Sequence, residues 1–261
     1  MDKKIFYNNS EAYYEALQNE TEDYYSEFIA LVRYNLKNKN IKIFDLGCGL
    51  GQSTFLLNQS GYDVTGFDYS HRFISHARAR YKNIKFIQGE AQKVNFSDAS
   101  FDAAVSYNTI EHLNNLDLCL AELIRITKPG GLIIIQAPNL LSPEYPFSAF
   151  KNSGQTYEGK KNLLELAAMF FRNIFWLAKK RVKRQFSLTY RQPIFDFSCN
   201  DNDAASYLNP YDLKLFFTGH GCEIVGYQQV DHLNSVSMFK KIASLCLPDF
   251  MGIIRIVARK K

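Results

Sequence analysis

Short apolar runs alternate with stretches of helical periodicity over residues 41–137. Five runs are four to seven residues long and rich in β-branched or aromatic side chains, which is typical of strands buried in a sheet. These runs are 41–46, 62–68, 84–87, 101–107 and 132–137. Between most of them, apolar residues recur at helical spacing, over about 52–60, 70–81 and 117–127. The alternation predicts an α/β, Rossmann-like, doubly wound domain, because right-handed crossovers make the strands parallel and gather ligands at their carboxyl ends.

The alternation is lost after residue 138 and resumes with a helix over 209–221. Two closing strands, 223–227 and 251–258, flank a predicted helix at about 236–247 and complete a seven-stranded, mostly parallel sheet. The chain is therefore expected to have four parts. They are an N-terminal helical cover (1–40), a ligand-binding core (41–138), a helical insertion or lid between strands five and six (139–209) and a C-terminal completion of the sheet (210–261).

Two long helices are predicted outside the core. The first covers residues 10–38, can be capped by Ser10 and is expected to cover the sheet or the ligand. The second covers 162–184, has one apolar face and one polar face, and ends in five basic residues between 179 and 184. Polar residues interrupt its apolar run well short of the ~20 residues that a membrane span needs. A lid, a dimer contact and a helix lying on an anionic membrane surface remain open as its role.

Composition and charge narrow the function classes. Hydrophobic residues make up 46% and charged residues 22%, which is ordinary for a globular protein. The net charge of +5 is concentrated at 179–184, whereas a nucleic-acid binder usually spreads its basic residues over a wider face. Five scattered cysteines form no C-x-x-C pair, so neither a disulfide framework nor a zinc site is indicated. Without an apolar leader at the N-terminus, we expect a cytoplasmic protein, with peripheral contact at the inner face of the membrane if the 162–184 helix binds lipid.

A glycine-rich turn follows the first strand. Asp45 ends the strand, and Gly47, Gly49 and Gly51 follow it two residues apart before a helix begins. Such a joint lets a ligand approach the backbone and presents free N–H groups at a helix N-terminus. The spacing is not the G-x-G-x-x-G of dinucleotide sites, and no lysine of a P-loop is present. Asp68, at the end of the second strand, is placed to accept hydrogen bonds from ribose hydroxyls; a turn residue at the strand end or a cap of the next helix is the alternative.

Further motifs follow at the ends of the later elements. They are Gly66-Phe-Asp68, Gly89-Glu-Ala91, Phe101-Asp102, Glu111-His-Leu113 and Lys128-Pro-Gly-Gly131. With the turn Asp45-Leu-Gly-Cys-Gly-Leu-Gly51, they make residues 41–139 resemble the class I S-adenosylmethionine-dependent methyltransferases, particularly the small-molecule group with a D-x-G-C-G-x-G turn. The resemblance implies an enzyme whose cofactor is S-adenosyl-L-methionine.

The resemblance also implies roles for single residues. The turn, with Asp45, Gly47, Cys48, Gly49 and Gly51, would pack against the methionine part of the cofactor. Asp68 would hold the ribose, Glu90 with Ala91 would reach the adenine amino group, and Tyr69 would stack on the adenine or belong to the core. Family members more often have aspartate at the position of Glu90. Asn108, after the fourth strand, completes the predicted cofactor-binding set.

His112 is the candidate catalytic residue, because it follows the end of the fourth strand and so faces the same cleft. It could act as a general base or contact the substrate, it could be structural, or it could share a metal ion with Glu111; adjacent ligands alone are weak evidence for a metal, so no metal is expected. Tyr107-Asn-Thr-Ile stands where amino-methylating enzymes carry an N-P-P-Y type motif. A hydroxyl oxygen is therefore the favoured acceptor atom.

The predicted function is methyl transfer to a small-molecule acceptor or to a lipid- or glycan-linked one. Substrate choice is expected to reside in the insertion, where Tyr145, Phe147, Phe150 and Tyr157 can line an acceptor pocket or pack within surface loops. Two other functions remain: an RNA methyltransferase that uses the basic helix, and a non-catalytic scaffold that keeps the cofactor fold. Nucleic acid is the less favoured partner.

Overall fold

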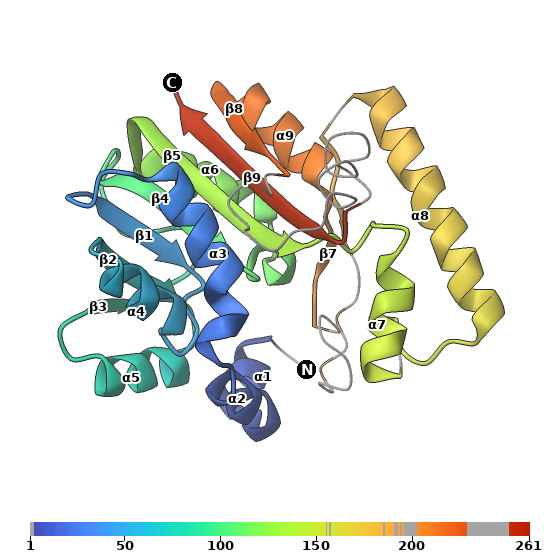
Figure 1. Ribbon diagram of the computed structural model, residues 1–261, viewed down its shortest axis with the longest axis horizontal. Helices are drawn as coiled ribbons and strands as arrows, with labels where there is room; N and C mark the ends of the chain where they lie inside the picture. The colour runs from blue at the N-terminus through green and yellow to red at the C-terminus, as the bar shows by residue number, and fades with distance from the viewer. Residues whose placement is uncertain are drawn as a thin grey trace.

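The computed structural model describes residues 3–154, 156, 158–184, 186–190, 193, 195, 203–228 and 251–261. Their centre is a seven-stranded sheet with the strand order β3-β2-β1-β4-β5-β9-β8 (Figure 1). Its strands are β1 (Lys42–Leu46), β2 (Asp63–Asp68), β3 (Lys85–Gln88), β4 (Phe101–Tyr107), β5 (Thr127–Pro138), β8 (Cys222–Tyr227) and β9 (Ile253–Lys260). Only β9 runs antiparallel to its neighbours. The predicted seven-stranded, mostly parallel α/β fold is confirmed; the helix predicted at about 236–247 lies outside the described residues.

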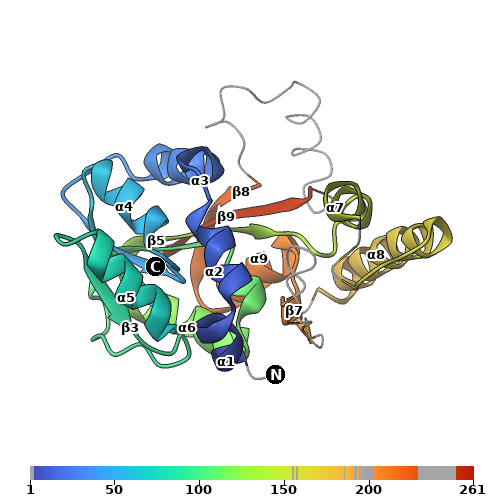
Figure 2. The same ribbon diagram turned by 90° about the horizontal axis from the view of Figure 1, so that it is seen from below.

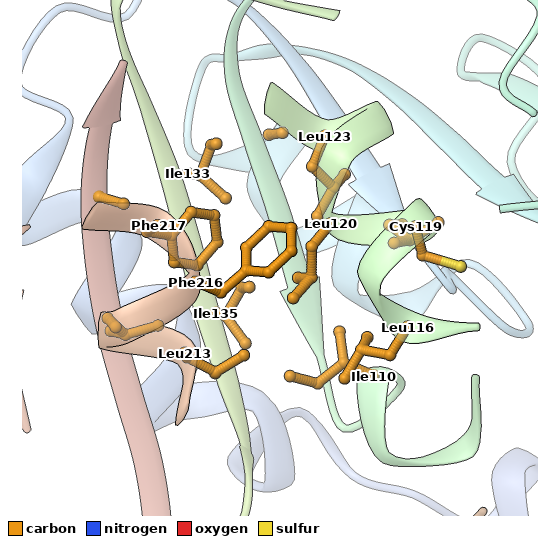
Figure 3. Close-up of a cluster of buried hydrophobic side chains, with 14 of the residues drawn as sticks. Ile110, Leu116, Cys119, Leu120, Leu123, Ile133, Ile135, Leu213, Phe216 and Phe217 are labelled. Atoms are coloured by element: carbon orange, nitrogen blue, oxygen red, sulfur yellow. The ribbon is translucent and has the colours of Figure 1, made fainter. Parts of the chain in front are cut away.

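Both faces of the sheet are covered by helices. α3 (Glu22–Asn35) and α4 (Gln52–Gln59) pack on one face, and α6 (Leu116–Ile126) and α9 (Pro210–Gly219) pack on the other, while α5 (His71–Arg80) lies against β3. Figure 3 shows side chains of α6 and α9 meeting over Ile133 and Ile135 of β5. Leu132 and Ile134 point to the opposite face. Burial on both faces explains why β5 is an uninterrupted apolar run.

The N-terminal segment is broken into several helices. The prediction of one helix over 10–38 is wrong: α1 (Lys3–Asn9) and α2 (Glu11–Gln18) precede α3. Ser10 caps α2, because its hydroxyl accepts a hydrogen bond from the Tyr13 N–H. Thr21 then starts α3 in an extended conformation, with two acids in the first turn that suit a helix N-terminus. The break lets α1 and α2 cross the carboxyl end of the sheet while α3 covers its face (Figure 2).

The insertion between the fifth and sixth strands of the sheet is mainly helical. It contains α7 (Tyr145–Ser153), α8 (Leu163–Lys183) and a small sheet of β6 (Thr189–Tyr190) and β7 (Ser206–Tyr207). Asn162 and Glu165 form a capping box at the start of α8. Among the described residues, no helix is long and apolar enough to cross a membrane.

Candidate active site

A cavity of about 1200 Å³ lies at the carboxyl ends of β1, β2 and β4 and beside the turn after β3. Most of the predicted cofactor-binding residues line it. They are Gly47, Cys48, Gly49, Asp68, Tyr69, Glu90, Ala91 and Asn108, and His112 lines it too. Asp45 and Gly51 do not. The volume exceeds the ~300–1,000 Å³ of most small-molecule pockets, so a cofactor and an acceptor group can share the cavity.

The three glycines of the turn meet different constraints. All have positive φ, which L side chains rarely adopt. A Cβ on Gly47 would lie 2.0 Å from Cγ2 of Thr109, and one on Gly51 would lie 2.9 Å from the Phe86 ring. A Cβ on Gly49 would meet nothing within 4 Å. Packing therefore requires Gly47 and Gly51, whereas Gly49 leaves open space at the cavity wall for a ligand.

Asp45 lies beneath the turn, and 1% of its surface is exposed. Its Oδ2 accepts hydrogen bonds of 2.7 Å from the hydroxyls of Ser53 and Thr54, in the first turn of α4, while Oδ1 has no hydrogen-bond partner among the described residues. Burial raises the pKa of Asp45 to about 6, although the two hydroxyls lower it. The structure thus gives Asp45 a role in holding α4 against β1.

The raised pKa makes a pH-dependent difference to stability. A carboxyl whose pKa is higher in the folded than in the unfolded state stabilises the fold at low pH, and this contribution is lost as the pH rises through 6. Relative to Asp45→Asn, the wild type should therefore lose about 2 kcal/mol of unfolding free energy between pH 4.5 and 7.5, since one pKa unit corresponds to about 1.4 kcal/mol. Urea unfolding at the two pH values measures the difference; parallel profiles for the two proteins would contradict it.

Asp68 projects from the end of β2 beside the turn. Its Oδ2 accepts a hydrogen bond from the Gly49 N–H (3.1 Å), and its Oδ1 accepts one from the Ser70 N–H (2.9 Å). Desolvation raises the pKa of Asp68, and these backbone donors oppose the rise. Ser70, and not Asp68, caps α5, because the Ser70 hydroxyl accepts a hydrogen bond from the Phe73 N–H at the start of that helix. Two backbone hydrogen bonds thus fix Asp68 at the cavity wall. Its carboxylate can also accept hydrogen bonds from the two hydroxyls of a ribose.

The other predicted cofactor contacts lie at the ends of β3 and β4. Glu90 is exposed and Ala91 half-buried in the turn after β3. The Tyr69 ring meets the Tyr7 ring edge to face at 5.8 Å, so it is packed on one side and lines the cavity on another. Asn108 has a left-handed φ of 45°. Its N–H donates to the carbonyl of Gln136, which ties the β4 loop to β5.

The charge of the cavity is strongly one-sided. Eight acidic side chains line it, against one guanidinium, that of Arg255, among the described residues; burial raises the pKa of one of these acids, Glu20, to about 7. The acids are Glu20, Asp23, Glu27, Asp68, Glu90, Glu111, Glu144 and Asp203. Arg255 is already paired with Glu27. Such a cavity disfavours phosphate and suits a ligand that carries sulfonium and ammonium groups, as S-adenosylmethionine does, so the residues present fit that cofactor.

His112 lines the cavity between two buried acids, Glu111 and Asp203. It ends a short 3₁₀ turn (Ile110–His112) after β4. Its Nδ1 is 3.3 Å from Oδ2 of Asp203, and its Nε2 is 3.5 Å from Oε1 of Glu111. Both carboxylates would stabilise an imidazolium, which forms when a histidine takes a proton from an acceptor. Among the described residues, no three His, Cys, Asp or Glu side chains are grouped as metal ligands would be.

Asp203 is a site residue that the sequence does not reveal. It comes from the far end of the insertion, 91 positions after His112, and no spacing motif connects the two residues. The chain is held there by a backbone hydrogen bond of 2.8 Å from the Ala205 N–H to the Glu111 carbonyl. Tyr7 of α1 donates its hydroxyl proton to Oδ2 of Asp203. Burial, and then the Asp203 charge, raise the pKa of Tyr7, so its hydroxyl stays a donor and orients the carboxylate.

Comparisons with known proteins agree with this geometry. Residues 44–135 match the family model described as a methyltransferase domain. A probable S-adenosylmethionine-dependent methyltransferase of Mycolicibacterium smegmatis is 31% identical over 100 residues, which are 38% of this chain and 39% of that protein. A malonyl-[acyl-carrier protein] O-methyltransferase of Erwinia pyrifoliae is 34% identical over 94 residues, 36% of each chain. A demethylmenaquinone methyltransferase of Chlorobaculum tepidum is 30% identical over 135 residues, 51% of this chain and 54% of that one. The matches thus span about a third to half of these relatives.

The fold extends further than the sequence similarity. A protein of Pyrococcus horikoshii superposes with a TM-score of 0.60 at 20% identity, covering 97% of this chain and 100% of its own. An S-adenosylmethionine-dependent methyltransferase of Mesorhizobium loti gives 0.57 at 15% identity, covering 90% and 98%. The superpositions and the sheet order define an α/β protein with a cavity at the carboxyl ends of its parallel strands. Over residues 44–135 the chain is thus similar to a methyltransferase domain, and the relative of Mycolicibacterium smegmatis that it matches is named as S-adenosylmethionine-dependent.

Proposed function

We propose that the protein transfers a methyl group from S-adenosylmethionine to a hydroxyl oxygen of a small-molecule acceptor or of a lipid- or glycan-linked one. The observation that carries the proposal is the acid-lined cavity, whose wall includes Asp68, the Gly49 turn and His112. When bound there, the cofactor supplies an electrophilic methyl group on sulfur. The similar protein of Erwinia pyrifoliae is named an O-methyltransferase, which supports an oxygen acceptor.

The residues of the site have distinct parts in this proposal. His112 takes the proton of the acceptor hydroxyl as the new carbon–oxygen bond forms. Asp203 faces Nδ1 of the ring and holds the imidazole in position, while Tyr7 orients Asp203. The 3.3 Å separation is longer than a good hydrogen bond, as is common before substrate binds. Tyr7 and Tyr13, from the N-terminal helices, line the same cavity and help to exclude water from it.

Cofactor binding gives the first test. Asp68→Ala should weaken the binding of S-adenosylhomocysteine about 100-fold, because two hydrogen bonds to a carboxylate, of about 1.5 kcal/mol each, are lost. Titration calorimetry measures the affinity. Asp63→Ala, at the exposed amino end of the same strand, is the matched control and should bind like the wild type. Unchanged affinity in Asp68→Ala, or no binding by the wild type, would overturn the cofactor assignment.

Methyl transfer itself gives the second test. Radiolabelled S-adenosylmethionine is incubated with the protein and with cell extract separated into lipid, RNA and small-metabolite pools. Label that enters the lipid or metabolite pool supports the proposed transfer, and resistance of that label to mild base excludes a methyl ester as the product. Label in RNA supports the RNA alternative, and no label in any pool despite tight cofactor binding supports a scaffold.

A further inference from the structure

An exposed apolar stripe runs along α8 on the side that faces away from the rest of the protein. Its large members are strongly exposed: Leu164 (83%), Phe171 (67%), Phe175 (64%) and Val182 (82%). With the exposed Ala168 and Ala178, they recur at steps of four and three residues, which places all six on one face of the helix. The opposite face, with Leu166, Met169 and Leu177, is buried against the protein. α8 is therefore anchored by one side and apolar on the other.

The stripe continues onto α7. The ring of Phe170 lies 5.4 Å from that of Phe171 and 6.1 Å from that of Phe147, and Phe147 and Phe150 are themselves exposed. Figures 1 and 2 both place α7 and α8 at the end of the molecule remote from β3 and α5. A single helical stripe is thus widened into an apolar surface built from two helices, here called the α7–α8 surface.

The charge around the α7–α8 surface is strongly positive. Residues 145–184 contain nine basic and two acidic residues, a net charge of +7, although the whole chain carries only +5. One acid, Glu158, is paired with Arg172, and one cation, Lys180, is buried with Asp212. Lys151, Lys160, Lys179, Lys183 and Arg184 are all exposed. The apolar surface thus has a cationic rim, whereas the cavity is lined by acids.

We propose that the α7–α8 surface docks on a membrane that contains anionic lipids. An apolar face with exposed phenylalanines, flanked by lysine and arginine, is the pattern of a helix that lies in the interface of such a membrane. Contact between two copies would bring the two cationic rims together, with Glu165 as the one exposed acid on each helix to offset them. Anionic headgroups complement the whole rim.

The docked orientation bears on the acceptor. α7 carries Phe147 and Phe150 on the α7–α8 surface, while Tyr145 and Ser148 of the same helix line the cavity. One helix therefore connects the apolar surface with the wall of the cavity. This connection favours a lipid-linked acceptor, an inference that rests on the proposed function. The polar head of the acceptor would enter the cavity while its tail stays in the membrane.

Flotation with vesicles tests the docking. The wild type should float with phosphatidylcholine vesicles that contain 30 mol% phosphatidylglycerol, a composition chosen for the assay, and not with pure phosphatidylcholine. Phe171→Ser/Phe175→Ser should reduce binding at least a hundredfold, because each buried phenylalanine contributes about 1.5–3 kcal/mol. Lys179→Gln/Lys183→Gln should reduce it about thirtyfold, at roughly 1 kcal/mol per cation. Two double variants on other faces of the protein are the matched controls and should bind like the wild type. They are Tyr34→Ser/Leu118→Ser and Lys42→Gln/Lys82→Gln.

Several outcomes would overturn the proposal. One is that the wild type does not float, and another is that Phe171→Ser/Phe175→Ser floats as well as the wild type. A third is a wild-type dimer in sedimentation that the two serine substitutions dissociate, while neither protein floats with vesicles. Binding of RNA that Lys179→Gln/Lys183→Gln abolishes, again without flotation, would also overturn it. Circular dichroism and S-adenosylhomocysteine binding of the serine variant check its fold. Failure of the wild type to bind S-adenosylhomocysteine would remove the proposed function and leave the docking result standing.

Discussion

His112→Gln is expected to slow methyl transfer about a thousandfold, within the 10²–10⁴ range of general acid–base catalysis, while the affinity for S-adenosylhomocysteine stays within twofold. Glutamine keeps the polarity of the side chain but cannot take the proton. The cofactor contacts at Asp68 and Gly49 lie elsewhere in the cavity and should persist. The measurement is single-turnover transfer of a radiolabelled methyl group to the acceptor pool identified in extract.

Asp203 provides a second variant for the same step. Asp203→Asn should lower kcat and shift its acid limb to lower pH, because the imidazolium of His112 would lose one of its two neighbouring charges. A purely structural role for Asp203 would leave the pH profile in place. Wild-type rates in His112→Gln would exclude this histidine as the base, whatever the cofactor result.

Asp212→Ala is expected to cost about 3–5 kcal/mol of unfolding free energy, because it leaves a buried ammonium without its counter-charge. Nζ of Lys180 on α8 lies 2.5 Å from Oδ2 of Asp212 on α9, and both side chains are almost completely buried. The same Nζ donates to the carbonyl of Ser187. The pair thus joins the insertion to the helix that covers the sheet, and urea unfolding measures its loss.

A surface pair gives the control for this variant. Arg259 and Glu223 are about half exposed and 3.8 Å apart, so Glu223→Ala should change stability by less than about 1 kcal/mol. Lys180→Met, which removes the ammonium and keeps the apolar volume, should cost less than Asp212→Ala. Equal losses in Asp212→Ala and Glu223→Ala would show that the buried pair does not hold α8 in place.

Local sequence determined the core of this protein. The apolar runs and the breaks between them predicted the seven strands, since each strand is a short segment whose burial depends on its own composition. The glycine turn and Asp68 were found because a βα joint brings its functional groups together within about 25 residues. α8 was found from helical periodicity, and its capping box is a pattern within four residues.

Tertiary structure decided which residues from distant segments come into contact. Asp203 meets His112 because the last part of the insertion lies beside the turn after β4, and the residues next to either one in the sequence do not indicate that contact. The single helix predicted over 10–38 was wrong because covering the sheet and crossing its carboxyl end require different directions. The exposed stripe of α8 likewise emerged only when the buried face was known: periodicity reports that a helix has apolar positions, but packing decides which of them face the protein and which face the solvent.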